Sequence, residues 1–221
     1  MRRLSLLVSP QAASIASVVS LWQMAGWLGF LADTIIPTPG SIFLAAIEGN
    51  NRNFLWRDLW VSIMRVIPAL LIGSFLGAVT GVVSGRVRLL GETIGPILHI
   101  WRALPAVALA PLFIQLFGIN ETSKIIIIAS GVFFPVWVNT HQGAGLVHRT
   151  YLDISKSFEL SIWSFYRNIV IPSTIPFTIA GIRNGIAMAY IMLFVAEWIG
   201  ASNGIGYRIS IAHIVFRMDL M

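Results

Sequence analysis

The sequence contains no cysteine, which excludes disulfide bonds, thiol chemistry and cysteine-ligated metal sites. Charge is also scarce: 11% of the residues are charged, about half the share in soluble domains, whereas 57% are apolar and the mean hydropathy is +0.82. Only two lysines occur, Lys124 and Lys156, and a serine precedes each of them. The glycine–lysine pair of a phosphate-binding loop is therefore missing, and we predict that this chain does not bind ATP in that way.

Catalytic and metal-binding patterns are missing as well. The four histidines do not fall at His-Glu-x-x-His or a comparable ligand spacing, and no nucleophile–base pair is recognisable. We therefore predict no catalytic residues and no metal site. The net charge of +6 could indicate nucleic acid, but the basic residues are scattered over short loops, and membrane topology explains them better.

What the sequence does contain is a series of apolar runs, most of them close to the roughly 20 residues that a helix needs to cross a bilayer. They are 12–31, 66–85, 103–120, 125–148 and, interrupted only by Arg183, 173–196. The alternation typical of a barrel strand is absent. The sequence predicts an all-α polytopic membrane helix bundle of about five spans, formed as a single domain over 1–221. The first run is too long for a removable signal peptide, so we expect a retained helix.

The basic residues give an orientation. One set of loops carries seven and the other carries five, offset by more acids. The first set is Arg2, Arg3, Arg86, Arg88, Arg149, Lys156 and Arg167; the second is Arg52, Arg57, Lys124, Arg208 and Arg217. By the positive-inside rule, we expect the N-terminus and the loop 146–172 in the cytoplasm, and a short external helix after Pro37-Thr38-Pro39.

The second apolar run has a glycine at every fourth residue. These glycines, Gly73, Gly77, Gly81 and Gly85, lie on one face of a helix. Such a face lets another helix approach backbone to backbone. We therefore predict a helix-packing contact there, either inside the bundle or across a dimer.

The loop 146–172 is polar between apolar neighbours. Phe158, Ile162 and Ile169 recur at spacings that favour one apolar stripe, and Pro172 is expected to end the run. The pattern predicts a pair of short amphipathic helices at the membrane surface. An interfacial helix resting on lipid headgroups is the alternative interpretation.

A family resemblance rests on this loop and on several other stretches in order. Asp153-Ile154-Ser155, Glu159 and Ile169-Val170-Ile171-Pro172 keep the register of the cytoplasmic loop in the permeases of ABC importers. The further matching stretches are Ile36–Pro39, Arg102–Pro105, Ala110–Leu112, Leu116–Ile119, Gly181–Arg183, Ala196-Glu197 and Gly200–Tyr207. Together they resemble the permease subunits of the nitrate, taurine and aliphatic-sulfonate importers over nearly the whole chain.

The resemblance implies the transmembrane domain of a type I ABC importer in a bacterial inner membrane. Its partners would be a dimer of ATPases that bind ATP, an extracytoplasmic solute-binding protein, a second permease copy and membrane lipid. The residues that would couple to the ATPase are Asp153, Ser155, Phe158, Glu159, Ile162, Ile169 and Pro172. The substrate would be a small oxyanion such as a sulfonate, taurine or nitrate; carriers of vitamin precursors belong to the same group.

Three departures from the family pattern stand out. Glu159 replaces a glycine that permits a left-handed turn, so we expect a strained or wider loop. The β-branched Ile154 replaces a small residue. The chain also reaches Met221 where members of the family continue into a last span, so we expect the bundle to lack that span.

Charged residues inside spans are costly and indicate function or pairing. We predict a translocation path at Arg102, Pro105, Arg183 and Asn184, with a structural role for the two arginines as the alternative. Arg65 and Glu197 fall near the same face and predict a structural ion pair.

Other functions remain open from the sequence. A self-sufficient secondary transporter or channel would use intramembrane acids for coupling, and Glu197 stands alone. A membrane enzyme lacks a catalytic cluster, and a scaffold would recruit another protein through 146–172. Copurification of an ATPase through that loop distinguishes these alternatives.

Overall fold

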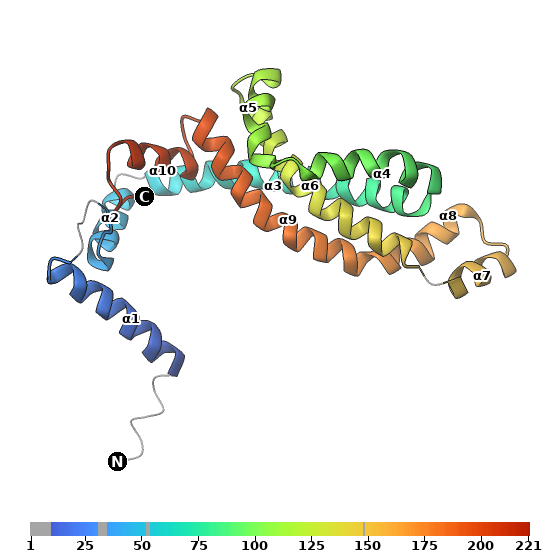
Figure 1. Ribbon diagram of the computed structural model, residues 1–221, viewed down its shortest axis with the longest axis horizontal. Helices are drawn as coiled ribbons and strands as arrows, with labels where there is room; N and C mark the ends of the chain where they lie inside the picture. Colours follow the sequence, from blue (N-terminus) through green and yellow to red (C-terminus); the bar gives the residue numbers. More distant parts are fainter. Residues whose placement is uncertain (1–9, 31–34, 52–53, 148) are drawn as a thin grey trace, which may run out of the picture. The chain divides into compact units, whose positions relative to one another are not determined.

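The computed structural model describes residues 10–30, 35–51, 54–147 and 149–221, and every regular element in these ranges is helical (Figure 1). The predicted all-α fold is confirmed. Three of the described helices are long and apolar enough to cross a membrane: α3 (Phe54–Arg86), α6 (Glu121–Gly145) and the continuous helix Ile162–Gly200, whose main part is α9 (Ile171–Gly200). A fourth crossing results if α4 (Arg88–Ala103) and α5 (Ala106–Phe117) form one bent span.

The spans expected at 66–85, 125–148 and 173–196 correspond to α3, α6 and α9. The span expected at 12–31 corresponds to α1 (Pro10–Trp27), which is not among the candidate spans. Residues 31 and 148, where two of the expected spans end, lie outside the described residues. The described residues thus form three or four candidate spans where about five were expected.

The span expected at 103–120 is different in the structure. The chain bends by 100° between α4 and α5, and residues 88–101, which lie outside the expected spans, are helical. Leu104 is extended, with φ −72° and ψ 134°, and Pro105 precedes the first residue of α5. Proline disfavours the helical conformation in the residue before it and has no N–H to donate, so the helix ends at this point.

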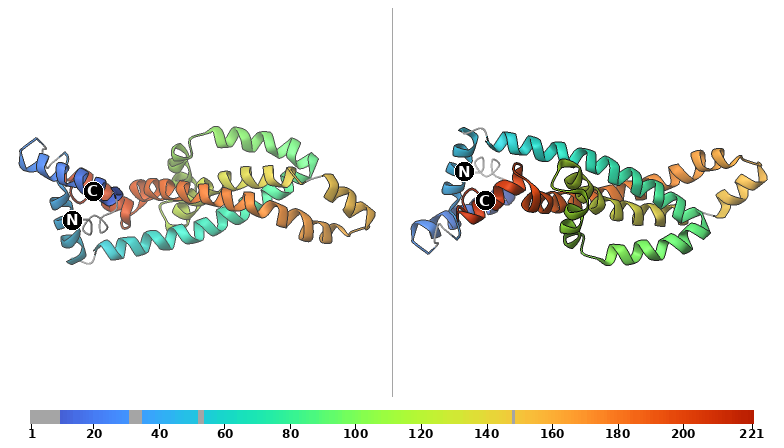
Figure 2. Two further views of the ribbon diagram at one scale, coloured as in Figure 1. Left: turned by 90° about the horizontal axis from the view of Figure 1, so that it is seen from below. Right: turned by 90° about the horizontal axis from the view of Figure 1, so that it is seen from above.

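The chain divides into two compact units, residues 60–206 and residues 1–59 with 207–221. In the larger unit α6 packs between α3 and α9, and the three helices run side by side in both views of Figure 2. The glycine face predicted on α3 is directed at α6: a methyl group at Gly77 would lie 2.8 Å from the carbonyl oxygen of Phe133. On α9, a methyl group at Gly181 would lie 2.9 Å from the Cα atom of Val136. The core is accordingly centred on α6, where Ile127, Ile128, Val132, Val136 and Trp137 are fully buried.

In the smaller unit, the predicted external helix is α2 (Pro39–Asn51), and Thr38 caps it by accepting a bond from the Ser41 amide at 3.3 Å. The α2 amide of Gly40 donates to the Gln23 side chain of α1 at 2.9 Å. The C-terminal segment contains most of α10 (Ile205–Ile214), from which Arg208 bonds Asp58 at 2.7 Å. Further along, Arg217 bonds Glu48.

Candidate functional site

The loop 146–172 forms a helical hairpin at one end of the larger unit (Figure 1). Helix α7 (Arg149–Ser157) is followed by a turn and then by α8 (Ile162–Phe165), as the predicted pair of short helices requires. However, α8 continues without interruption through the π-helical turn η1 (Tyr166–Val170) into α9. The expectation that Pro172 ends the run is therefore wrong. Pro172 lies inside this continuous helix, directly after η1, and the wider π-type turn accommodates a residue without an N–H.

The turn of the hairpin exposes large apolar side chains. Phe158, Ile162 and Trp163 are each at least 70% exposed, whereas Ile169 is half-buried. On α7, Asp153 is exposed and Ser155 is half-buried. Exposed aromatic and aliphatic side chains at a turn make it a candidate interaction surface.

Glu159 has the left-handed backbone conformation, with φ +46°. The amide of Leu160 donates to the carbonyl of Ser155 at 2.9 Å, which is the bond that closes a helix end of the Schellman type. Glycine is the usual residue at this position because a Cβ atom is strained there. The left-handed turn expected of a glycine is thus present with a glutamate, and of the two expected forms of the loop, strained or wider, the strained one is observed.

Arg102, Pro105 and Asn184, predicted to line a translocation path, come together on one cavity of about 540 Å³. Four helices contribute to its walls, α4, α5, α6 and α9. Arg183 does not line this cavity. The sequence prediction missed Ser130 and Asn139, both on α6, which also line it. Their positions within an otherwise apolar span were the signal that could have identified them.

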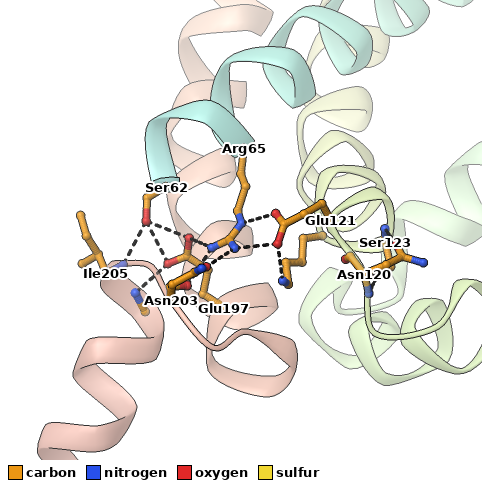
Figure 3. Close-up of polar contacts among 10 residues, drawn as sticks. Ser62, Arg65, Asn120, Glu121, Ser123, Glu197, Asn203 and Ile205 are labelled. Atoms are coloured by element: carbon orange, nitrogen blue, oxygen red, sulfur yellow. Dashed lines mark hydrogen bonds and ion pairs between the residues drawn. The ribbon is translucent and has the colours of Figure 1, made fainter. Parts of the chain in front are cut away.

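A second polar site is a cluster around Arg65 (Figure 3). The expected ion pair is present: Nη1 of Arg65 donates to Oε1 of Glu197 at 2.7 Å, and the Glu197 side chain is fully buried. Ser62 Oγ donates to the same carboxylate at 2.8 Å, and so does the Gly206 amide. Three donor groups, from Ser62, Arg65 and Gly206, thereby satisfy the Glu197 carboxylate.

The other side of the Arg65 guanidinium was not predicted from the sequence. It donates to both carboxylate oxygens of Glu121, at 2.6 and 2.8 Å, and to Oδ1 of Asn203 at 2.6 Å. Lys124 donates to Glu121 at 2.8 Å. Glu121 and Lys124 stand three residues apart at the start of α6, which indicates a local pair but not its third member. The cluster joins α3, α6, α9 and the turn after α9, and its formal charges balance.

The chain matches one protein family and is similar to transport permeases of known name. Residues 69–221 match the family described as "Binding-protein-dependent transport system inner membrane component". The putative aliphatic sulfonates transport permease of Bacillus subtilis is 34% identical over 194 residues, which cover 88% of this chain and 70% of that protein. The nitrate import permease of Synechococcus elongatus is 28% identical over 88% of this chain and 69% of that protein. The taurine transport permease of Escherichia coli is 26% identical over 99% of this chain and 81% of that protein.

Proposed function

We propose that a separate ATPase drives this chain, which belongs to the family of binding-protein-dependent transport system inner membrane components. It is a multi-pass inner-membrane permease of the nitrate, taurine and sulfonate group of ABC importers. The full sequence lacks a phosphate-binding loop, so the energy has to come from a partner. An extracytoplasmic solute-binding protein delivers the substrate, and a second permease copy completes the pathway.

The observation that carries this proposal is the exposed hairpin α7–α8. Phe158, Ile162 and Trp163 lie at its turn with at least 70% of each side chain exposed. A cytoplasmic ATPase covers this apolar group, and η1 transmits its movement into α9 because the helix is continuous from Ile162 to Gly200. In this orientation the Arg65 cluster lies toward the outer face, and the N-terminus is cytoplasmic provided that the run 12–31 crosses the membrane as the sequence predicts.

The substrate that fits this proposal is a small oxyanion. The three relatives carry names for sulfonates, nitrate and taurine, each of which bears a planar or tetrahedral group of oxygens. Among the described residues that line the 540 Å³ cavity, one cation and no acid are present, which favours an anionic solute.

Phe158→Ala tests the coupling. The ATPase should no longer copurify with the detergent-solubilised chain, because truncating a large apolar side chain at the centre of an interface typically weakens binding about tenfold or more. Phe43→Ala is a matched control: Phe43 is 68% exposed, close to the 75% of Phe158, but lies on α2. ATPase retained by Phe158→Ala, or lost equally from both variants, contradicts the docking role.

A further inference from the structure

The cavity between α4, α5, α6 and α9 has one charged group. Of its fourteen lining residues ten are apolar, glycine or proline, and the polar ones are Arg102, Ser130, Asn139 and Asn184. Apolar walls with a few converging polar groups are typical of sites that bind small molecules, and 540 Å³ lies within their usual size. Because the walls have low polarity, the field of the single guanidinium is weakly screened inside.

Arg102 is not neutralised by the part of the chain that the structure describes. No hydrogen bond or ion pair to it is found among those residues, in contrast to Arg65, which has carboxylate partners on two helices. An unpaired cation within the bilayer is energetically costly. An arginine kept without an acid in a membrane cavity therefore has capacity for an anion from outside the chain.

The amides add directed donors. Asn184 has no hydrogen bond within the described residues, so its carboxamide is available to a solute in the cavity. Asn139 donates one N–H of its side chain to the Pro135 carbonyl at 2.8 Å, which fixes the amide and leaves its second N–H. A guanidinium and two carboxamides present several N–H groups, and oxyanions accept such groups through two or three oxygens at once.

We propose that this cavity is the contact site for a small monovalent oxyanion during its passage, with Arg102 as the charge partner and Asn184 and Asn139 as hydrogen-bond donors. The inference rests on the proposed function and deepens it by placing the substrate's contact on four named helices. Arg183, one residue from Asn184, has no part in the site because its side chain does not line the cavity.

Arg102 also lies in the last turn of α4, where a cation stabilises the carbonyl end of a helix. That role alone would stabilise the helix and require no anion. Helix stabilisation and anion binding by Arg102 differ in one measurable property, which is whether the cavity prefers a negatively charged solute.

The native chain has no cysteine, so a single engineered thiol is a clean probe. Met188→Cys places it on the wall of the cavity, one helical turn after Asn184, and Val138→Cys is a second position should the first variant fail to fold. The purified whole chain is labelled at low salt with an anionic, sulfonate-bearing methanethiosulfonate and with a cationic trimethylammonium one. The ratio of the two rates should fall about tenfold when Arg102→Gln is added, the lower end of the effect of electrostatic steering. Arg183→Gln is the matched control and should leave the ratio within about twofold.

Protection by an oxyanion completes the test. Sodium methanesulfonate should slow labelling of Met188→Cys by a neutral reagent at least about threefold relative to sodium chloride at equal ionic strength, and Arg102→Gln should abolish the difference. An unchanged rate ratio in Arg102→Gln, an equal change in Arg183→Gln, or no protection by methanesulfonate overturns the site. Neither measurement uses an ATPase, so this failure is distinct from a failure of the proposed function, which the copurification of the ATPase reports.

Discussion

Glu159 shows that a residue other than glycine can hold a left-handed turn. Its left-handed backbone closes α7 through the bond from the Leu160 amide to the Ser155 carbonyl. For a residue with a Cβ atom that conformation costs about 1–2 kcal/mol. The turn persists because the hairpin on both sides of it is already set by helices.

Glu159→Gly should therefore raise the thermal unfolding midpoint of the purified chain or leave it unchanged, although a substitution by glycine usually lowers the stability of a protein. Relief of about 1 kcal/mol of strain offsets the larger entropy that glycine has in the unfolded chain. Glu159→Gln, which removes the charge and retains the strain, is the control and should unfold like the native chain. Leu160→Gly, whose backbone is not left-handed, should lower the midpoint. If Glu159→Gly also lowers the midpoint, the left-handed backbone of Glu159 is not strained.

At the residue scale, the sequence was most useful where the chemistry allowed few choices. Arg65 and Glu197, each costly inside a membrane, had to find a partner, and they pair. Glu121 was not assigned to them, because its pairing depends on where the first turn of α6 lies relative to α3, which no local pattern contains. Asn203 was missed for the same reason: its contact comes from the turn after α9.

Among the elements, α6 is the one on which the others depend. The glycines of α3 bring the backbone of α3 next to it, with a Cβ at Gly77 only 2.8 Å from the Phe133 carbonyl oxygen and 2.9 Å from the Val136 Cβ. Real Cβ atoms are essentially never found so close to backbone. The approach of these two helices therefore depends on the absence of a side chain.

Gly77→Ala should force α3 and α6 apart and lower the unfolding midpoint by roughly 5 °C, since overpacking of a close contact typically costs 1–3 kcal/mol. Gly95→Ala is the matched control on α4, where a Cβ would meet nothing within 4 Å. There the greater helix propensity of alanine should maintain or raise the midpoint. Equal midpoints for the two variants would show that α3 can shift at no cost.

The prolines show what sequence patterns convey about elements and what they do not. The span expected at 103–120 begins instead at a 100° bend around Pro105. At Pro172 the sequence predicted the end of a helix, yet the helix continues. A proline breaks a helix only if its N–H is needed and its neighbours cannot adjust, and η1 supplies the adjustment. No residue pattern in the sequence predicts a π-helical turn such as η1.

On the scale of the whole molecule, the cluster around Arg65 ties together segments that are 56 to 138 residues apart in the chain. Ser62, Arg65, Lys124 and Glu197 are buried, Asn203 is half-buried, and the Glu121 side chain is 60% exposed. Buried ions of opposite sign are stable only together, because each alone would have to be removed from water without compensation.

Glu197→Gln should destabilise the larger unit by about 3 kcal/mol, since it leaves Arg65 with part of its charge unbalanced at a buried position. The double variant Arg65→Met with Glu197→Gln should cost less than the sum of the two single variants. Thermal unfolding of all three variants measures this coupling. Arg88→Gln is the control, because its pair with Glu92 is exposed and contributes little. Additive losses in the double variant would show that the two residues act independently.

The glycine faces on both sides of α6 also restrict how this permease can move. Where backbone touches backbone, no layer of side chains exists that could change rotamer and let one helix slide along the other. We expect α3, α6 and α9 to move as one rigid body. The proposed ATPase contact would act on this body at the hairpin, and the Arg65 cluster would hold the three helices together at the opposite end. Opening and closing of a passage then requires bending at the α4–α5 corner or, if the proposed second copy is present, separation from it. A crosslink from α3 to α6 should therefore leave transport intact, while a crosslink across the α4–α5 corner should stop it.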